Sequence, residues 1–204
     1  MVGQDVSQKF VKKQTHLVAG VDEVGIGALA GPVVAAAVIL DPNSPVEGIT
    51  DSKKISEKKR KTLSEEIKKF AFDWAIGQAS IEEIDRINIL NASHLAMQRA
   101  VSDLSCRPSL ILVDGNKVPE FSEKAESIIK GDQKIMAIGA ASILAKVFRD
   151  DLMKSFATGY PAYGFEKHKG YPTKDHVKQL QFAGPCKLHR KSFAPVKNWN
   201  IKSL

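Results

Sequence analysis

The sequence predicts a mixed α/β domain in which helices alternate with strands and acidic residues stand at the strand ends. Three observations lead to this prediction. Short apolar runs rich in Val and Ile stop at turn residues, segments with helical spacing separate these runs, and Asp or Glu follows several of them. A chain of 204 residues is long enough for one such domain with a small appendage.

The first part of the chain predicts three strands and a helix. Residues 17–24 form a short apolar run that closes in an acid pair and a glycine loop, so we expect a strand that ends at a site. The charge-free run 32–40 stops at Asp-Pro-Asn and predicts a buried neighbouring strand. Residues 56–70 open with Ser56 and have helical spacing, so they predict a capped helix. Residues 72–80 predict the third strand.

The second part predicts two further strands among helices. Residues 81–104 have helical spacing and predict a short helix and a longer one that begins after Asn88. Residues 110–113 predict a strand with Asp114 at its carboxyl end. The remaining elements are an edge strand over 127–130 that ends at Gly131-Asp132, an Ala-rich helix over 135–156 and a helix over 173–182.

The net charge of +7 is concentrated at one end of the chain. Residues 1–159 carry equal numbers of basic and acidic side chains, whereas residues 160–204 carry nine basic and two acidic ones and all three tyrosines. We therefore divide the chain into a domain over 1–159 and a basic extension over 160–204. Basic groups among aromatics bind phosphates and stack on sugars or bases. A solvated, lysine-rich surface is the competing interpretation.

Composition excludes several classes of protein. Apolar residues make up 43% of the chain and charged residues 26%, which is typical of a globular protein with a core. No uninterrupted apolar stretch is long enough for a membrane span, and no secretory signal is visible. Cys106 and Cys186 belong to no Cys/His cluster, which argues against a disulfide framework and a thiolate metal site. We expect a cytoplasmic protein without a membrane partner.

Four acids follow or end apolar runs and are candidate metal ligands: Asp22, Glu23, Asp114 and Asp132. A carboxylate near a core needs a compensating cation or basic side chain, and Mg²⁺ prefers carboxylate oxygens. Two such ions would suit phosphodiester hydrolysis. Two alternatives stay open at this point. Asp114 before Gly-Asn is typical of a turn, and adjacent strand residues such as Asp22 and Glu23 normally point to opposite faces.

Residues 25–30 also match the dinucleotide-binding pattern G-x-G-x-x-A. That pattern requires a helix directly after the glycines. Pro32 and the β-branched run behind it predict a strand instead. We therefore expect the glycines to let backbone N–H groups approach a ligand or phosphate closely.

Several sequence blocks, read in order, strongly resemble the ribonuclease HII family. The resemblance spans about residues 18–196, so it covers nearly the whole chain. The blocks are GVDEVGIG (20–27), LAGPV (29–33), DSKK (51–54), VDGN (113–116), KGD (130–132), AASILAKV (140–147), KHKGY (167–171) and HRKSF (189–193).

The resemblance implies a ribonuclease H-like fold, with a five-stranded mixed sheet flanked by helices and a helical C-terminal extension against the substrate groove. It implies an endonuclease that cuts the RNA strand of RNA/DNA hybrids and incises 5′ of a ribonucleotide embedded in duplex DNA, leaving 3′-hydroxyl and 5′-phosphate ends. Mn²⁺ or Mg²⁺ would be the cofactor. The family's metal-binding catalytic acids match Asp22, Glu23, Asp114 and Asp132, while Asp150 is expected to be a structural partner on its helix.

The resemblance also implies how substrate is recognised. The 2′-hydroxyl separates RNA from DNA, and the family detects it with the glycine loop and a tyrosine, which match Gly25, Ile26, Gly27 and Tyr171 here. The expected phosphate or groove contacts are Lys53, His168, Lys169 and Arg190.

This chain departs from the family pattern at two positions. Ile26 stands where the family has Arg between the two glycines, which removes a guanidinium from the loop. At Asp151 a basic residue is commoner, and we expect only a surface effect. We expect a monomer whose partners are RNA/DNA hybrids and ribonucleotide-containing duplexes. The alternatives are another polynucleotide transferase of the same superfold, such as a resolvase or integrase, and a non-catalytic basic nucleic-acid-binding module.

Overall fold

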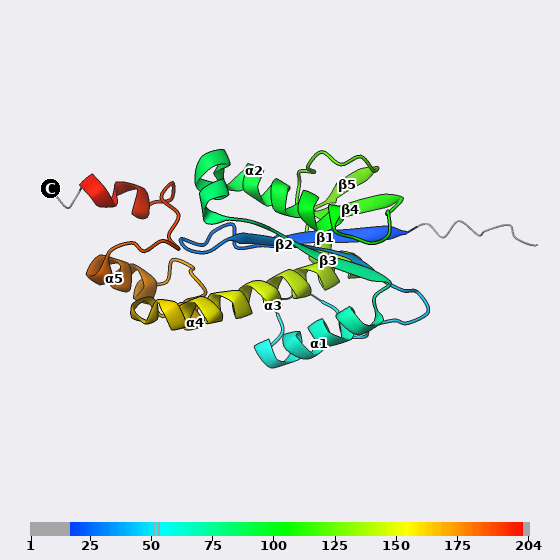
Figure 1. Cartoon of the computed structure of the whole chain (residues 1–204). Coiled ribbons are helices and arrows are strands. Elements are labelled where there is room, and N and C mark those ends of the chain that lie inside the picture. The colour runs from blue at the N-terminus through cyan, green and yellow to red at the C-terminus, as the bar shows by residue number, and fades with distance from the viewer. Residues whose placement is uncertain (1–16, 51, 53, 202–204) are drawn as a thin grey trace, which may run out of the picture.

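The computed structural model describes residues 17–50, 52 and 54–201. A central sheet lies between helix α2 on one face and helices α1 and α3 on the other, with the C-terminal helices gathered at one end (Figure 1). The strands are β1 (Val18–Val24), β2 (Val33–Ile39), β3 (Asp73–Ala79), β4 (Leu110–Asp114) and β5 (Ala125–Ile128). The helices are α1 (Glu57–Phe70), α2 (Ile81–Ser102), α3 (Met136–Gly159), α4 (Phe165–His168) and α5 (Lys174–Ala183), and the 3₁₀ segments are η2 (Gly131–Gln133), η3 (Pro161–Tyr163) and η4 (Val196–Ile201).

The five strands form one mixed sheet in the order β3-β2-β1-β4-β5. β1 pairs antiparallel with β2, β2 pairs antiparallel with β3, and the pairs β1–β4 and β4–β5 are parallel. The predicted five-stranded mixed α/β sheet is confirmed. Because β1 and β4 are parallel neighbours, their carboxyl ends meet at the same edge of the sheet.

Strand β2 explains why the run 32–40 shows no polar alternation. All seven of its residues are buried. Val33, Ala35 and Ala37 face the core under α2, and Val34, Ala36 and Val38 face the core under α1 and α3. A strand covered on both faces needs apolar residues at every position, and the alanines let the helices approach the sheet closely.

Side-chain caps mark helix starts, and the cap at Ser56 is the one that the sequence predicted. Ser56 accepts a hydrogen bond from the Lys59 backbone N–H at the start of α1, and Thr173 does the same for His176 at the start of α5. Asn88, at φ 67°, breaks α2 into two helical parts, as its position predicted. The edge strand was placed too late, since β5 ends at Ile128. Lys130 adopts a left-handed φ of 57°, which turns the chain out of the sheet into η2.

The C-terminal extension packs onto the domain through a third apolar cluster. Tyr163, Phe165 and Leu188 bury their side chains against Ala30 and Met153. Ala30 also forms an isolated antiparallel bridge with His189. The Asp85 carboxylate on α2 accepts hydrogen bonds from the backbone N–H groups of Lys191 and Ser192. The extension is thereby fixed to the loop that follows β1. In the described part of the chain, none of the helices has the length and apolar character that a bilayer crossing needs.

Candidate active site and nucleic-acid interface

Two of the predicted acids lie side by side at the carboxyl edge of the sheet. Val21 of β1 pairs with Val113 of β4, so the next residues, Asp22 and Asp114, are neighbours across the two strands. Val21 and Val113 both face the core under α2. Because strand side chains alternate, Asp22 and Asp114 both point to the opposite face, toward α3. The sheet register therefore brings together two carboxylates that are 92 positions apart in the sequence.

Asp132 joins this edge through the turn before α3. It lies in η2, directly ahead of the helix, and it is buried. The Gly131 backbone N–H donates to Asp114 Oδ1 at 2.6 Å, which ties η2 to the end of β4. A Cβ at Gly131 would meet Ile138 Cδ1 at 2.6 Å, so a larger residue there would have to displace the end of that side chain. Gly20 allows a similar approach on β1, where a Cβ would stand 2.1 Å from the backbone carbonyl carbon of Ala137.

Asp22 has a strongly perturbed pKa. Burial raises its pKa well above the ordinary value, and the charges of Glu23 and Asp114 raise it further. A hydrogen bond with Ser142 on α3 and one from the Glu23 backbone N–H, at 2.8 Å, act in the opposite direction. Ser142 also shares a 2.9 Å hydrogen bond with Ser52, from the predicted DSKK block. Negative charge on Asp22 is therefore disfavoured until a cation compensates it.

Glu23 is half-buried on the other face of the same strand end, and its charge is one of those that act on Asp22. Within the ranges that the structure describes, no group of three or more His, Cys, Asp or Glu side chains is arranged to hold a metal ion. The donor set itself is one that Mg²⁺ or Mn²⁺ accepts, since it consists of carboxylate oxygens from three segments. The mutual repulsion at Asp22 is what a divalent ion would relieve.

The glycine loop, residues 25–32, follows β1 directly, and the guanidinium groups of Arg149 and Arg190 bind its carbonyls. Gly25 has a φ of 99°, and a Cβ there would meet Arg149 Nε at 2.3 Å, so the loop requires glycine at this position. Ile26 and Gly27 are exposed, and a Cβ at Gly27 would meet nothing within 4 Å. These two residues form the exposed part of the loop, and their contact with a substrate stays a prediction.

Tyr171 lies in the turn between α4 and α5 and adjoins the glycine loop. The Leu29 backbone N–H donates to the Gly170 carbonyl at 2.8 Å. The Tyr171 ring is partly exposed and stacks near two cations, with Lys146 Nζ 5.5 Å and Arg149 Cζ 5.3 Å from its centroid. Gly25 and Tyr171 therefore both lie against Arg149, although 146 positions separate them in the sequence.

The other predicted contact residues are placed differently. Arg190 is fully buried, with Nε donating to the Gly31 carbonyl at 2.9 Å and Nη1 to the Ile26 carbonyl at 3.0 Å. It therefore holds the loop and does not face solvent, as a direct phosphate contact would. Lys169 Nζ donates to the carbonyls of Glu166 and Lys167, at 2.5 and 3.2 Å. Lys53 lies outside the described residues.

His168 belongs to a group of three histidines whose ring nitrogens all have partners, and two of the three, His176 and His189, are buried. Its Nε2 lies 2.7 Å from the Tyr163 carbonyl, and its Nδ1 accepts from the Gly170 backbone N–H. The ring stacks on His176 with centroids 4.2 Å apart, and His176 Nε2 is 3.1 Å from His189 Nε2. Burial lowers the pKa of His168 and lowers those of His176 and His189 to about 4. These rings are uncharged and structural, and His176 holds the backbone of Tyr171 through its carbonyl.

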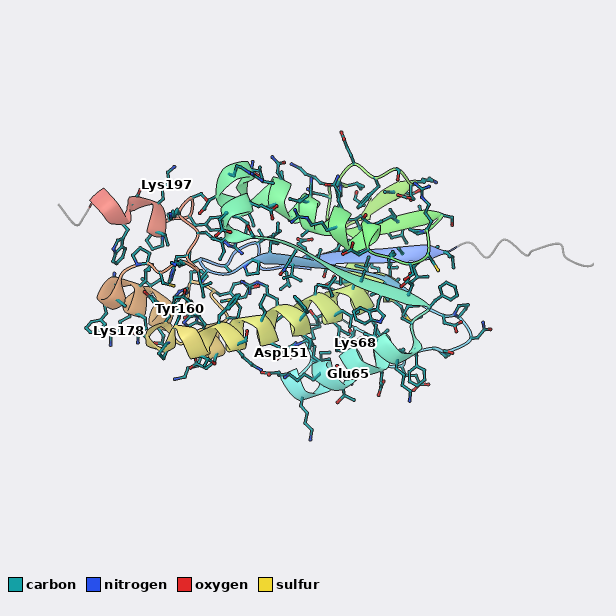
Figure 2. All side chains as sticks on the ribbon, viewed as in Figure 1. Glu65, Lys68, Asp151, Tyr160, Lys178 and Lys197 are labelled. Carbon is teal, nitrogen blue, oxygen red and sulfur yellow. The ribbon has the colours of Figure 1, made fainter. Side chains whose placement is uncertain are left out.

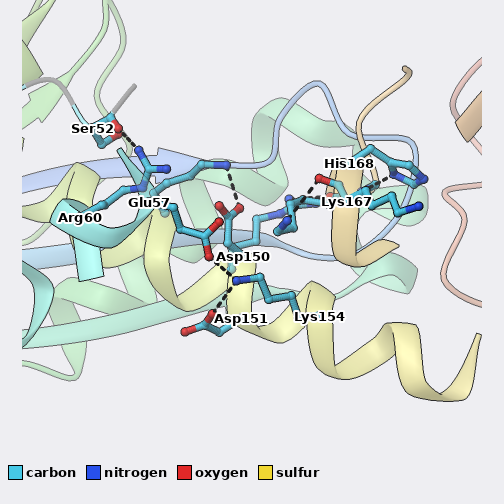
Figure 3. A network of polar contacts seen from close by, with 12 residues as sticks. Ser52, Glu57, Arg60, Asp150, Asp151, Lys154, Lys167 and His168 are labelled. Atoms are coloured by element: carbon cyan, nitrogen blue, oxygen red, sulfur yellow. Dashed lines mark hydrogen bonds and ion pairs between the residues drawn. The ribbon is translucent and has the colours of Figure 1, made fainter. Parts of the chain in front are cut away.

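Asp150 is paired as the sequence predicted. It is buried on α3 and accepts a hydrogen bond from Lys146 at 2.7 Å, one turn earlier. Figure 3 shows it within a polar network in which Lys154 also reaches Glu57 on α1 and Asp151 on its own helix. Asp151 forms a further ion pair with Lys61 at 2.9 Å. The acidic residue at this position therefore joins α3 to α1 on the surface.

Sequence reasoning missed Arg149, Ser142 and His176. The AKVFRD stretch predicts a helix, and nothing in its spacing tells that Arg149 folds inward under the glycine loop. Ser142 lay within a resemblance block but carried no chemical signal of its own. A buried cation can be found only when the elements that cover it are placed.

Solved structures of ribonucleases H have a fold similar to that of this chain. Ribonuclease H2 from Pyrococcus horikoshii OT3 superposes with a TM-score of 0.75 at 25% identity, over 91% of this chain and 97% of that chain. Bst-RNase HIII in complex with Mn²⁺ superposes with a TM-score of 0.66 at 17% identity, over 92% and 70% of the two chains. The chain has the ribonuclease H-like fold that its sequence predicted.

The sequence comparisons narrow this class to one family. The family model of ribonuclease HII matches residues 19–196. Ribonuclease HII of Vibrio campbellii is 56% identical over 182 residues, which cover 89% of this chain and 86% of that protein. The relative from Vibrio parahaemolyticus is 55% identical over the same shares. The chain belongs to the ribonuclease HII family, and the predicted resemblance is confirmed. It is a ribonuclease H, a hydrolase that acts on RNA/DNA.

Proposed function

We propose that this enzyme cuts the RNA strand of RNA/DNA hybrids and incises 5′ of single ribonucleotides embedded in duplex DNA, leaving 3′-hydroxyl and 5′-phosphate ends. One observation carries the proposal. The carboxylates of Asp22 and Asp114 stand at the sheet edge from which the glycine loop leaves, and that loop adjoins Tyr171. The loop that is suited to detecting a ribose therefore follows directly on the strand end that carries groups suited to hydrolysis.

In this proposal Asp22, Glu23, Asp114 and Asp132 hold two divalent ions, Mg²⁺ or Mn²⁺. The raised pKa of Asp22 supports this assignment, since its carboxylate is crowded by burial and by two other acids. When bound, the ions supply an activated water and stabilise the leaving oxygen of the phosphodiester. The carboxylates fix the ions, and the hydrogen bond between Gly131 N–H and Asp114 holds one of these groups in place.

The glycine loop and Tyr171 act on the substrate itself. Backbone N–H groups of residues 25–27 donate to the 2′-hydroxyl of the ribonucleotide, which a deoxyribonucleotide lacks. The Tyr171 ring stacks on the deoxyribose that follows. Cation–π contacts with Lys146 and Arg149 hold the ring in that position. A ribose followed by a deoxyribose satisfies both contacts, so the junction is recognised as a pair of sugars.

The basic extension over 160–204 holds the duplex in this proposal. Lys178 on α5 and Lys197 lie at the C-terminal end of the molecule, away from Glu65 and Lys68 on α1 (Figure 2). We propose that Lys53, His168, Lys169 and Arg190 support phosphate or groove binding, with Arg190 acting through the loop that it holds. We further propose that the enzyme is a cytoplasmic monomer and that hybrids and ribonucleotide-containing duplexes are its partners.

Cleavage of matched duplexes with zero, one and four ribonucleotides, in Mg²⁺ and in Mn²⁺, tests the proposal. We expect cutting 5′ of the single ribonucleotide and no cutting of the all-DNA duplex. Cutting of the all-DNA duplex would favour a different polynucleotide transferase of this superfold.

The variant Asp114→Asn tests the role of the acids. It should lose cleavage on the order of a thousandfold, because a ligand charge at the reacting centre is removed, and it should keep duplex binding. Asp103→Asn, an exposed aspartate at the end of α2, is the matched control and should cleave normally. Full activity in Asp114→Asn would instead favour a binding module whose cleavage comes from elsewhere.

A further inference from the structure

Arg149 joins the glycine loop to the segment that carries Tyr171. It projects from α3 and is fully buried. Its guanidinium donates from Nε to the Pro32 carbonyl at 2.9 Å, from Nη2 to the Ala30 carbonyl at 3.0 Å and from Nη1 to the Lys169 carbonyl at 3.0 Å. The same group lies 5.3 Å from the Tyr171 ring centroid. One side chain therefore fixes both halves of the proposed recognition surface to a single helix.

Arg190 holds the tip of the same loop from the extension. Its Nη1 donates to the Ile26 carbonyl and its Nε to the Gly31 carbonyl. A peptide group is planar and trans, so its C=O and N–H point in opposite directions. Because the Ile26 carbonyl points at the buried guanidinium, the N–H of Gly27 points away from it. Gly27 is exposed, so this N–H is turned to the side from which a substrate would come.

Both arginines carry charge in a place where charge is costly. Burial lowers the pKa of Arg149, and burial together with the charge of Arg149 lowers that of Arg190 to about 9. Arg190 Nη2 is buried without a hydrogen-bond partner. Among the described residues neither guanidinium forms an ion pair with a carboxylate, although Asp150 and Asp85 act on them from a distance. Apolar side chains could fill this volume at lower cost, but they could not bind five carbonyls.

We propose that Arg149 and Arg190 are positioning residues that set the selectivity of the enzyme for a ribonucleotide-to-deoxyribonucleotide junction. Neither touches the substrate. Arg190 orients the Ile26–Gly27 peptide toward the ribose, and Arg149 holds Tyr171 at a fixed place relative to that peptide. In this chain, where Ile26 brings no cation to the loop, the positive charge behind the loop comes from these two buried groups. The inference rests on the proposed function.

The variants Arg149→Lys and Arg190→Lys test it. Lysine keeps the charge but cannot bind two or three carbonyls in the planar geometry of guanidinium. We measure kcat and KM on a duplex with one ribonucleotide and on an all-RNA/DNA hybrid, which lacks the junction. A misplacement of a substrate-positioning group by about 1 Å lowers the rate on the order of a hundredfold. We therefore expect kcat/KM on the single-ribonucleotide duplex, divided by kcat/KM on the hybrid, to fall by roughly tenfold or more. The hybrid should be affected much less.

Two controls separate positioning from a loss of stability. Arg107→Lys changes an exposed arginine that is paired with Glu123 far from the loop, and it should leave the ratio unchanged. Ile67→Ala truncates a fully buried side chain of α1 and should lower the melting temperature. It should change kcat/KM on both substrates by the same factor. Substrate selectivity is a property of the folded fraction, so reduced stability alone does not move it.

The outcomes are distinguishable. If the parent enzyme does not cut the single-ribonucleotide duplex, the proposed function fails. If the parent cuts it but both arginine variants, shown to be folded by circular dichroism, lower kcat/KM on the two substrates by the same factor, the proposed function stands and the positioning role is overturned. If one arginine variant does not fold, the other still decides the result, because each holds the loop through different carbonyls.

Discussion

We expect the histidine cluster to make the stability of this protein fall on mild acidification. His176 Nδ1 lies 2.9 Å from the Tyr171 carbonyl, so it must carry a proton, since two acceptors do not bond. In the neutral ring Nε2 is then an acceptor, and His189 Nε2, 3.1 Å away, donates to it. His189 Nδ1 accepts from the Cys186 backbone N–H at 3.0 Å. These contacts give each neutral ring a defined tautomer, and a further proton on either ring would break one of these hydrogen bonds.

The direction and size of the effect follow from linkage. Both rings are buried and titrate at about 4 in the folded protein, whereas an unfolded histidine titrates near ~6.5. Between these values the unfolded chain binds more protons, so stability is full above about pH 7 and is lost as the pH falls toward 4. From pH 7 to pH 5 the loss is about 2 kcal/mol for each ring. In a chain of this size it corresponds to a decrease in Tm of about 4–8 °C per ring.

Urea unfolding at pH 7, 6 and 5 measures this slope, with the double variant His176→Gln/His189→Gln as the comparison. The variant cannot titrate at these positions, so its unfolding free energy should change much less with pH. The ion pair with Arg99 lowers the pKa of Glu83 to about 2 in the folded protein, whereas an unfolded glutamate titrates near ~4.3. The pH dependence that this carboxylate adds therefore falls mainly below pH 5. Equal slopes for the parent and the variant would refute the assignment of neutral, buried rings.

Three further predictions follow from the fold and the loop. Gly20→Ala places a Cβ against the α3 backbone and should cost about 1–3 kcal/mol, with a fall in Tm by thermal melting and a loss of cleavage, because α3 begins just after Asp132; an unchanged Tm would contradict the close approach. Ile26→Arg should lower KM on a single-ribonucleotide duplex and steepen its salt dependence, and unchanged values of both would contradict a role for the missing cation. Neutralising three lysines of the extension should weaken duplex binding and flatten its dependence on salt, measured by fluorescence anisotropy, with an unaltered slope arguing against the extension as the duplex clamp. These lysines are Lys167, Lys169 and Lys174.

The sequence predicted the sheet and the main helices because their signals are local. The run 32–40 is apolar at every position, and Ser56, Asn88 and Thr173 mark helix ends or breaks by their own chemistry. Helix α4 and the 3₁₀ segments were missed because three or four residues do not establish a period. The end of β5 was misplaced because Lys130 adopts a left-handed conformation, and lysine is not a residue type from which such a turn can be predicted.

The candidate site was predicted in part for the same reason. Acids that follow apolar runs can be found in the sequence, and the resemblance to a family assigns four of them to one site. The orientation of Arg190 could not be found, because a basic residue in a basic segment is expected at the surface. Whether it folds inward depends on the carbonyls of the glycine loop, which belong to a segment 159 positions away.

Helix α3 also fixes the distance between the acidic site and the glycine loop. It begins beside Asp132, places Ser142 against Asp22, and two turns later places Arg149 beneath the glycine loop. Seven residues of α-helix span about 10 Å, and neither end can slip without turning one side chain off its face. On the proposed function, the distance between the bond that is cut and the sugar that is read is set by this one rigid element. Insertion of a single residue between Ser142 and Arg149 would rotate one site by about 100° relative to the other, so the offset between recognition and incision is a constant of the fold.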